Sequence, residues 1–385
     1  MKSCLQASCG LELDTVGRVR ACCLADPFVD ENGNEYNLST NSLEEIWNSP
    51  SRKKLLDDLQ NGIENPTCKI CWVEEKHGRE SKRQRENQRD LVIKDTPQVL
   101  DLKLGNTCNL RCRTCNPDSS SSWVTEWYDV YHTTNTPKSE FLQKYKRIRD
   151  LYSSTNEALW KTLEEWIPKC ILIDFYGGEP LLIERSWDIL RKCVADGYSN
   201  QQELHFNTNA TIFLSDQQIE TLKNFKQVNI SLSIDGIKEK FEYMRYPAKW
   251  DIVAENIRKY SDLSKQYDHI RVDFCYTVSI MNVWDIIEFD SFVQTNYPTL
   301  GIYYNMLFTP KHFSITVIPE TIKSIVSQRL LEYSPRMREI TNMLFQETHD
   351  PIKFKKLFTI LDMHDTYRKN YFKESFPEWH SVLVE

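Results

Sequence analysis

Short apolar runs alternate with longer segments of helical length between residues 98 and 310. Six of these runs are typical of buried strands: QVLDLKL, ILIDFY, ELHFN, VNISLSI, IRVDFCYTV and GIYYNML. Strands separated by helices pair in parallel through crossover connections. The pattern therefore predicts an α/β fold, either a full or partial barrel or a doubly wound sheet.

The flanking regions have a different character. Residues 1–75 are rich in turns, with one helix candidate, SLEEIWNSPSRKKLLDDLQNG, which begins with a Ser-x-x-Glu cap and ends at Gly62. The basic stretch KHGRESKRQREN fits either a solvated linker helix or a contact to a substrate phosphate. The chain has a helical pattern after Pro310. We expect a small module over 1–75, a basic linker helix over 76–97, the α/β part over 98–310 and a helical extension over 311–385.

Composition narrows the class of protein. The 385 residues are 40% hydrophobic and carry a formal net charge of -7, which fits a globular chain and argues against one that coats nucleic acid. Neither a signal-peptide pattern nor a run of about eighteen apolar residues is present, so we expect a soluble cytoplasmic protein with no membrane contact. Nine of the twelve cysteines lie in the first 115 residues, at short spacings. Such spacings in a reducing compartment favour metals or clusters over disulfides.

Cys108, Cys112 and Cys115 form a C-x3-C-x2-C motif directly after the first predicted strand. Three thiolates on one tight loop can hold three irons of a [4Fe-4S] cube and leave the fourth iron open to a small ligand. A structural zinc site is the alternative, and it would need a fourth ligand such as His132 or a distant cysteine. Cys170, Cys193 and Cys275 are isolated in the sequence, and we expect them to be buried structural thiols.

The run CNLRCRTC resembles the cluster loop of the radical S-adenosylmethionine (SAM) superfamily, and the resemblance extends over residues 98–310. Thr114 departs from it, since many members carry there an aromatic residue that packs by the adenine. Gly177, Gly178, Glu179 and Pro180 follow the second strand and resemble the family's GGEP motif. Glycines at this point let the backbone approach the SAM amino group. The resemblance implies a catalytic [4Fe-4S] cluster with SAM on its open iron.

Two further strand ends carry residues that the resemblance assigns to SAM. Thr208 and Asn209 match a Thr-Asn pair near the methionine end, although a capped turn is an alternative for them. Alternation along VNISLSIDG directs Ser231, Ser233 and Asp235 to one side, which suits ribose hydroxyls and favours Ser233 over Ser231. Arg245 resembles the arginine aimed at the SAM carboxylate; a surface arginine is the alternative. Because the carboxyl ends of barrel strands open on one face, the motifs predict a partial (β/α)6 TIM-like barrel.

A second cysteine set lies in the N-terminal module. Gly17 marks a turn between two short runs, which would return Cys22 towards Cys4, and Cys68 and Cys71 follow as a C-x2-C pair. The segment resembles the auxiliary-cluster module called twitch, or half of a SPASM domain. The resemblance implies a second [4Fe-4S] cluster on Cys4, Cys22, Cys68 and Cys71, with Cys9 and Cys23 as alternates. A four-cysteine zinc ribbon is the structural alternative.

The resemblance implies an enzyme that cleaves SAM reductively to a 5′-deoxyadenosyl radical and takes hydrogen from a substrate. Twitch and SPASM modules accompany peptide substrates, so a peptide or protein side chain is the first expectation, with a nucleotide, sugar or other small molecule as the alternative. A non-enzymatic zinc-binding interaction protein is the second alternative. Nucleic acid is not expected as a substrate. A reductant such as flavodoxin or ferredoxin is the expected partner, and no residue is identified as a hydrogen donor or acceptor.

Overall fold

The computed structural model describes residues 3–76, 78, 80–89, 91–131, 137–153 and 155–384. Its centre is one curved sheet of eight strands in the order β2-β1-β3-β4-β5-β6-β7-β8. All neighbouring pairs are parallel except β1 with β2. This arrangement confirms the predicted α/β class with a parallel sheet.

The six predicted strands all form, and two more join them. The predicted ones are β3 (Val99–Leu102), β4 (Leu172–Phe175), β5 (Glu203–Thr208), β6 (Gln227–Ser233), β7 (Ile270–Val278) and β8 (Gly301–Met306). The additional strands are β1 (Gly10–Leu13) and β2 (Val19–Arg20), from the region expected to be a separate module. Because β1 pairs with β3 through four residues, the N-terminal region is part of the main sheet.

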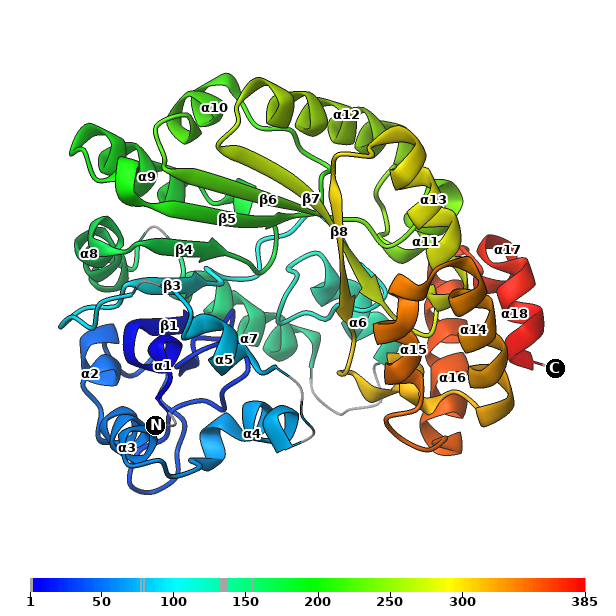
Figure 1. Cartoon of the computed structure of the whole chain (residues 1–385), viewed down its shortest axis with the longest axis horizontal. Helices are drawn as coiled ribbons and strands as arrows, with labels where there is room; N and C mark the ends of the chain where they lie inside the picture. The colour runs from blue at the N-terminus through cyan, green and yellow to red at the C-terminus, as the bar shows by residue number, and fades with distance from the viewer. Residues whose placement is uncertain are drawn as a thin grey trace.

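Helices cover the outer, apolar face of the curved sheet (Figure 1). Along it lie α8 (Glu157–Trp166), α9 (Glu184–Ala195), α10 (Asp216–Leu222), α12 (Trp250–Gln266) and α13 (Ile286–Asn296). The core between these helices and the strands is strongly aromatic; Phe175 and Trp187 both stack on Phe206. Alternation along the strands sends the apolar side chains to this face and leaves polar ones on the concave face.

The N-terminal region forms short elements beneath β1 and β3 (Figure 1). They are α1 (Leu5–Cys9), α2 (Leu43–Trp47), α3 (Pro50–Gln60), the 3-10 helix η1 (Pro66–Cys68), α4 (Lys69–Lys76) and α5 (Lys82–Glu86). The single helix expected up to Gly62 is two helices, because Ser49 caps a new helix that begins with Pro50. Among the described residues of 76–97, the helix is limited to the five residues of α5 and the end of α4.

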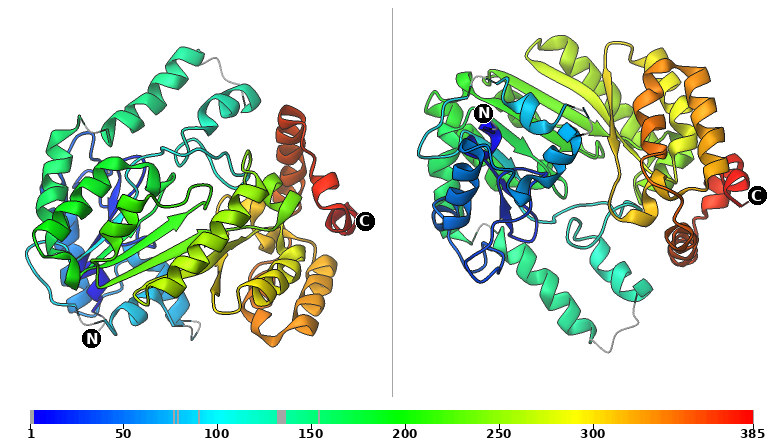
Figure 2. Two further views of the ribbon diagram at one scale, coloured as in Figure 1. Left: turned by 90° about the horizontal axis from the view of Figure 1, so that it is seen from above. Right: turned by 60° about the horizontal axis from the view of Figure 1, so that its bottom comes forward.

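The helical character expected after Pro310 is present. The extension contains α14 (Glu320–Tyr333), α15 (Arg338–Leu344), α16 (Pro351–Arg368), α17 (Phe372–Ser375) and α18 (Pro377–Val384), at the opposite end of the molecule from the N-terminus (Figure 1). Between β3 and β4, α6 (Trp123–Tyr131) and α7 (Lys138–Leu151) project away from the sheet (Figure 2), and α11 (Lys238–Met244) follows β6. Among the described residues, no helix combines the length and apolar character needed to cross a membrane.

Candidate functional site

The loop after β3 carries Cys108, Cys112 and Cys115 close together. Burial, partly offset by the nearby Arg245 guanidinium, raises the pKa of Cys112 to about 12. Burial and then the neighbouring Cys112 thiol raise the pKa of Cys115 as well. The backbone amide of Leu110 donates to Cys108 Sγ at 3.4 Å. Charged thiolates at such positions need a compensating cation, which iron would supply.

Other segments of the same chain fix this cluster loop through hydrogen bonds to its backbone. The amides of Arg111 and Arg113 donate to the carbonyls of Tyr246 and Met244, at 2.6 and 2.9 Å, in the segment that follows β6. Trp123 Nε1, at the start of α6, donates to the Cys112 carbonyl at 3.0 Å. The loop is therefore held in place by distant parts of the chain.

The GGEP motif packs directly against the cluster loop. Gly177 and Gly178 both have positive φ, and a Cβ on Gly178 would lie 2.3 Å from the carbonyl oxygen of Thr107. The Glu179 amide donates to that same carbonyl at 2.8 Å. Any side chain at Gly178 would push the motif away from the loop, so the position requires glycine for space and for conformation.

Glu179 links the GGEP motif to the end of β5. Its fully buried carboxylate accepts from Thr208 Oγ1 at 2.9 Å and from the Asn209 amide at 2.8 Å. Burial raises its pKa to about 7 despite these hydrogen bonds. Asn209 Nδ2 in turn lies 4.0 Å from Cys108 Sγ. The structure thus brings Glu179, Thr208 and Asn209 together beside the first cysteine.

Asp235 and Arg245 form a buried ion pair above β6, with Arg245 Nε 2.8 Å from Asp235 Oδ2. Arg245 is also close enough to Cys112 to influence its pKa. Arg245 is therefore not a surface arginine. Ser233 is half-buried near the strand end, whereas Ser231 lies one step deeper and its Oγ is 3.0 Å from His205 Nε2.

The auxiliary cysteines also gather in one place. Burial, with a smaller contribution from the neighbouring Cys71, raises the pKa of Cys4 to about 11. Burial and then Cys4 and Cys71 raise the pKa of Cys68 to about 12. Cys4 also contributes to the raised pKa of Cys22. The β1–β2 hairpin, with Gly17 at φ +87°, returns Cys22 towards Cys4 as the sequence predicted. Cys9 lies apart beside Arg52, and Cys23 Sγ accepts from Lys82 Nζ at 3.2 Å.

Sequence reasoning missed a layer of polar side chains on the concave face. Glu12, Asp101, Asp174 and His205 occupy one lateral row on four adjacent parallel strands. Cys275 lies on the same face of β7 and is influenced by Asp235 and Arg245, so this thiol borders the site although it is buried as expected. The signal was present in the sequence. Asp174 in ILIDFY and His205 in ELHFN each stand between two apolar residues, so alternation directs them to the opposite face of the strand.

A second missed feature is the contact of the C-terminal extension with the cluster loop. From α16, Asp365 Oδ1 pairs with Arg113 Nη1 at 2.7 Å, and Arg368 Nη2 donates to the Arg111 carbonyl at 2.8 Å. Arg368 Nε pairs with the buried Glu126 of α6 at 2.6 Å. More than 240 residues separate these partners, so local patterns could not reveal them.

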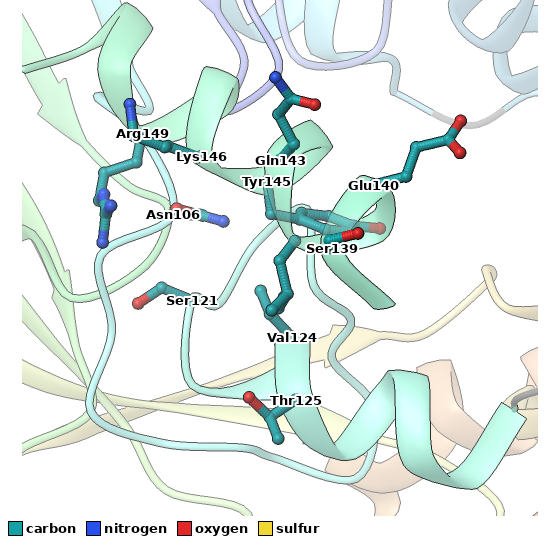
Figure 3. A pocket seen from close by; sticks show the side chains of 11 residues that line it. Asn106, Ser121, Val124, Thr125, Ser139, Glu140, Gln143, Tyr145, Lys146 and Arg149 are labelled. Atoms are coloured by element: carbon teal, nitrogen blue, oxygen red, sulfur yellow. The ribbon is translucent and has the colours of Figure 1, made fainter. Parts of the chain in front are cut away.

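A cavity of about 910 Å³ lies between the end of the cluster loop and helices α6 and α7 (Figure 3). Asn106 and Ser121 line it on the side of the loop, and Lys146 and Arg149 line the α7 side. The Ser121 hydroxyl accepts from the Cys108 amide at 3.4 Å. The cavity therefore adjoins the cluster loop.

Both thiol sets fit iron–sulfur clusters. Among the described residues, no three His, Cys, Asp or Glu side chains lie close enough to share one metal ion. Thiolates of a [4Fe-4S] cube each bind a different iron, so they stand further apart than the ligands of a single ion. His132, the candidate fourth zinc ligand, lies outside the described residues.

Comparison with known proteins gives two family matches. The radical SAM superfamily model matches residues 102–293, and the SPASM model, an iron–sulfur cluster-binding domain, matches residues 4–72. GTP 3′,8-cyclase of Aliarcobacter butzleri is 22% identical over 257 residues, which cover 66% of this chain and 70% of that protein.

Solved structures give weaker similarities. Native anSMEcpe with bound AdoMet and Cp18Cys peptide is 15% identical with a TM-score of 0.39, and the match covers 65% of this chain and 62% of that one. Streptococcus suis SuiB bound to precursor peptide SuiA is 12% identical with a TM-score of 0.35, covering 92% and 60%. The chain thus spans about three fifths of the length of these solved chains. On the family matches, the chain belongs to the radical SAM superfamily with an N-terminal SPASM domain, and it is an enzyme whose cofactors are SAM, a [4Fe-4S] cluster and an auxiliary iron–sulfur cluster.

Proposed function

We propose that this enzyme takes a hydrogen atom from a substrate held on the concave face of the sheet, between a catalytic cluster on Cys108, Cys112 and Cys115 and an auxiliary cluster on Cys4, Cys22, Cys68 and Cys71. One observation carries the proposal: a continuous series of neighbouring polar groups joins the two thiol sets. When bound, the catalytic cluster and SAM supply the electron and the 5′-deoxyadenosyl radical. The protein's own residues bind, orient and exclude water.

The series of neighbours starts beside Cys22. Cys23 lies close enough to Lys82, Asp101 and Glu12 for their charges to shift the pKa of its thiol. Asp101 pairs in register with Asp174, and Asp174 with His205. From His205 the series runs through Ser231 to Asp273 and Cys275 on β7. Cys275 adjoins Asp235 and Arg245, which adjoin Cys112.

We assign the SAM contacts to the residues beside the cluster loop. Gly177 and Gly178 bring a strand-end backbone to the amino group, and Glu179 fixes Thr208 and Asn209 at the methionine end. Ser233 and Asp235 face the ribose, with Ser231 as the deeper alternative. Arg245 uses Nε for Asp235, and among the residues that the structure describes no contact is seen to its two terminal nitrogens, which we assign as donors to the SAM carboxylate.

A peptide or protein side chain is the substrate we favour, because a SPASM domain adjoins the concave face. The second candidate is a small molecule, which the 22% identical GTP 3′,8-cyclase favours. The polar row of Glu12, Asp101, Asp174 and His205 argues against a nucleoside triphosphate, because it carries three carboxylates and the neighbouring Lys103 is already bonded to Glu12. A flavodoxin or ferredoxin of the cytoplasm would supply the electron.

Anaerobic SAM cleavage under dithionite tests the proposal. We expect wild type to form 5′-deoxyadenosine, Cys112→Ala to form none, and Cys68→Ala to retain some cleavage because the catalytic loop is intact. Cys170→Ala, which removes a buried thiol that belongs to neither set and precedes β4, is the matched control and should keep full cleavage. Equal turnover by wild type and Cys112→Ala would overturn the assignment. Incubation with GTP and with a peptide library separates the two substrate classes.

A further inference from the structure

The lateral row on the concave face is made of carboxylates in a place where few are expected. Register pairs Glu12 with Asp101, Asp101 with Asp174, and Asp174 with His205. Residues paired laterally in a sheet point to the same side, so the three carboxylates share the concave face. Asp174 and His205 are only half-buried, which leaves open surface beside the row.

Two oxygens of this row lack partners. Asp101 is 5% exposed and Glu12 is 1% exposed. Within the part of the chain that the structure describes, neither Asp101 Oδ1 nor Glu12 Oε2 has a hydrogen-bond partner. An unsatisfied buried oxygen costs stability, and a carboxylate more than a neutral group, so such atoms call for a donor from a ligand.

The cations near the row are already engaged. Lys103 is bonded to the other oxygen of Glu12, and Lys82 donates to Cys23. His205 has both ring nitrogens in use, with Nδ1 2.9 Å from the Tyr176 hydroxyl and Nε2 3.0 Å from Ser231 Oγ. Burial and then the Glu12 carboxylate raise the pKa of Asp101 to about 7, and the lysines Lys103 and Lys82 offset this rise only in part.

We infer that the concave face binds a cationic group of the substrate, a primary ammonium or a guanidinium, through the carboxylates of Asp101 and Asp174. The inference rests on the proposed function, in which the substrate occupies this face. An ammonium or guanidinium carries only donors, so it satisfies the unpaired oxygen and compensates its charge together. An anionic group would meet three carboxylates, and the two lysines described beside the row, Lys82 and Lys103, are already engaged.

Binding of small peptide analogues to the reconstituted, SAM-loaded enzyme tests the inference. The probes are Nα-acetyl-lysine methylamide and Nα-acetyl-arginine methylamide, with Nα-acetyl-norleucine methylamide as the neutral match and Nα-acetyl-glutamate methylamide as the anionic one. Calorimetry gives the affinities. We expect at least one cationic probe to bind about ten-fold more tightly than norleucine, the effect of one charge-assisted hydrogen bond.

Isosteric variants locate the binding. Asp101→Asn should lose the ten-fold preference, and Asp174→Asn, at a half-buried position, should reduce it without endangering the fold. Glu239→Gln, an exposed carboxyl change on α11, is the matched control and should keep the preference. Iron content and 5′-deoxyadenosine formation of each variant report whether the clusters and SAM site are intact.

Three outcomes would overturn the inference: no preference of wild type for a cationic probe, tighter binding of the glutamate probe, or an unchanged preference in both Asp101→Asn and Asp174→Asn. In each case retained 5′-deoxyadenosine formation would leave the proposed radical chemistry standing. Loss of 5′-deoxyadenosine formation in wild type would instead contradict the proposed function itself.

Discussion

At the scale of single residues, Gly178 decides whether the SAM motif and the cluster loop can touch. The carbonyl of Thr107 occupies the space that a side chain at Gly178 would need, and the next residue, Glu179, hydrogen-bonds to that carbonyl. The Glu179 carboxylate in turn accepts hydrogen bonds from Thr208 and Asn209 and so positions both residues. One glycine therefore sets the relative position of three predicted SAM contacts.

We predict that Gly178→Ala lowers the free energy of unfolding by about 2 kcal/mol, because the methyl group must displace a backbone carbonyl. SAM affinity should fall with it. Gly197→Ala is the matched control, since Gly197 also has positive φ but no atom within 4 Å of the added Cβ. Urea denaturation and SAM titration measure both variants. Equal effects at the two positions would show that backbone conformation, and not the contact with Thr107, is what matters.

At the scale of elements, sequence patterns can predict individual strands and the motifs at their ends. They predicted β3 to β8, which the structure confirms, because period-two alternation is local; the cysteine triplet and the polar residues at the ends of β4, β5 and β6 stay predictions as cluster and SAM contacts. They indicated short runs on either side of Gly17 but not that the first of them, β1 (GLEL), joins the main sheet, because its pairing with β3 is a contact between distant parts of the chain. Contacts of α16 with the cluster loop were equally invisible, because no local rule connects Arg368 to Arg111.

We predict that Arg368→Gln lowers the free energy of unfolding by about 3 kcal/mol, since it leaves the buried Glu126 carboxylate without its closest cation. Cluster content and 5′-deoxyadenosine formation should fall too, because the Arg368 bond to the cluster loop is lost. Arg258→Gln, which breaks an exposed pair with Glu255, is the control and should have no measurable effect. Urea midpoints and iron assays on both variants give the comparison; unchanged iron in Arg368→Gln would limit α16 to a purely stabilising role.

At the scale of the whole molecule, the two cysteine sets are connected through one sheet. The auxiliary set begins before β1 and ends in α4, and β1 lies directly beside β3, whose end leads into the catalytic cluster loop. The auxiliary cluster would therefore support the catalytic domain mechanically as well as chemically.

We predict that wild type binds about eight irons per chain and Cys68→Ala about four, as expected for two cubes and one. Loss of the auxiliary cluster should lower the melting temperature of the whole chain in a single transition, because β1 and β3 share hydrogen bonds. Calorimetry, with hydrogen exchange of residues 99–102, checks this. An early, separate transition confined to residues 4–76 would show that the N-terminal region unfolds by itself.

The pairing of β1 with β3 also limits how such an enzyme can be rearranged. A domain with its own closed sheet can be cut out, moved to another gene or fused elsewhere as a cassette. The N-terminal region contributes strand β1 to the sheet of the catalytic domain. Its removal would leave β3 as an exposed edge strand, which is prone to pair with other chains. We therefore expect the N-terminal region and the radical SAM domain to be inherited together. We also expect them to be expressed in folded form only as a single chain.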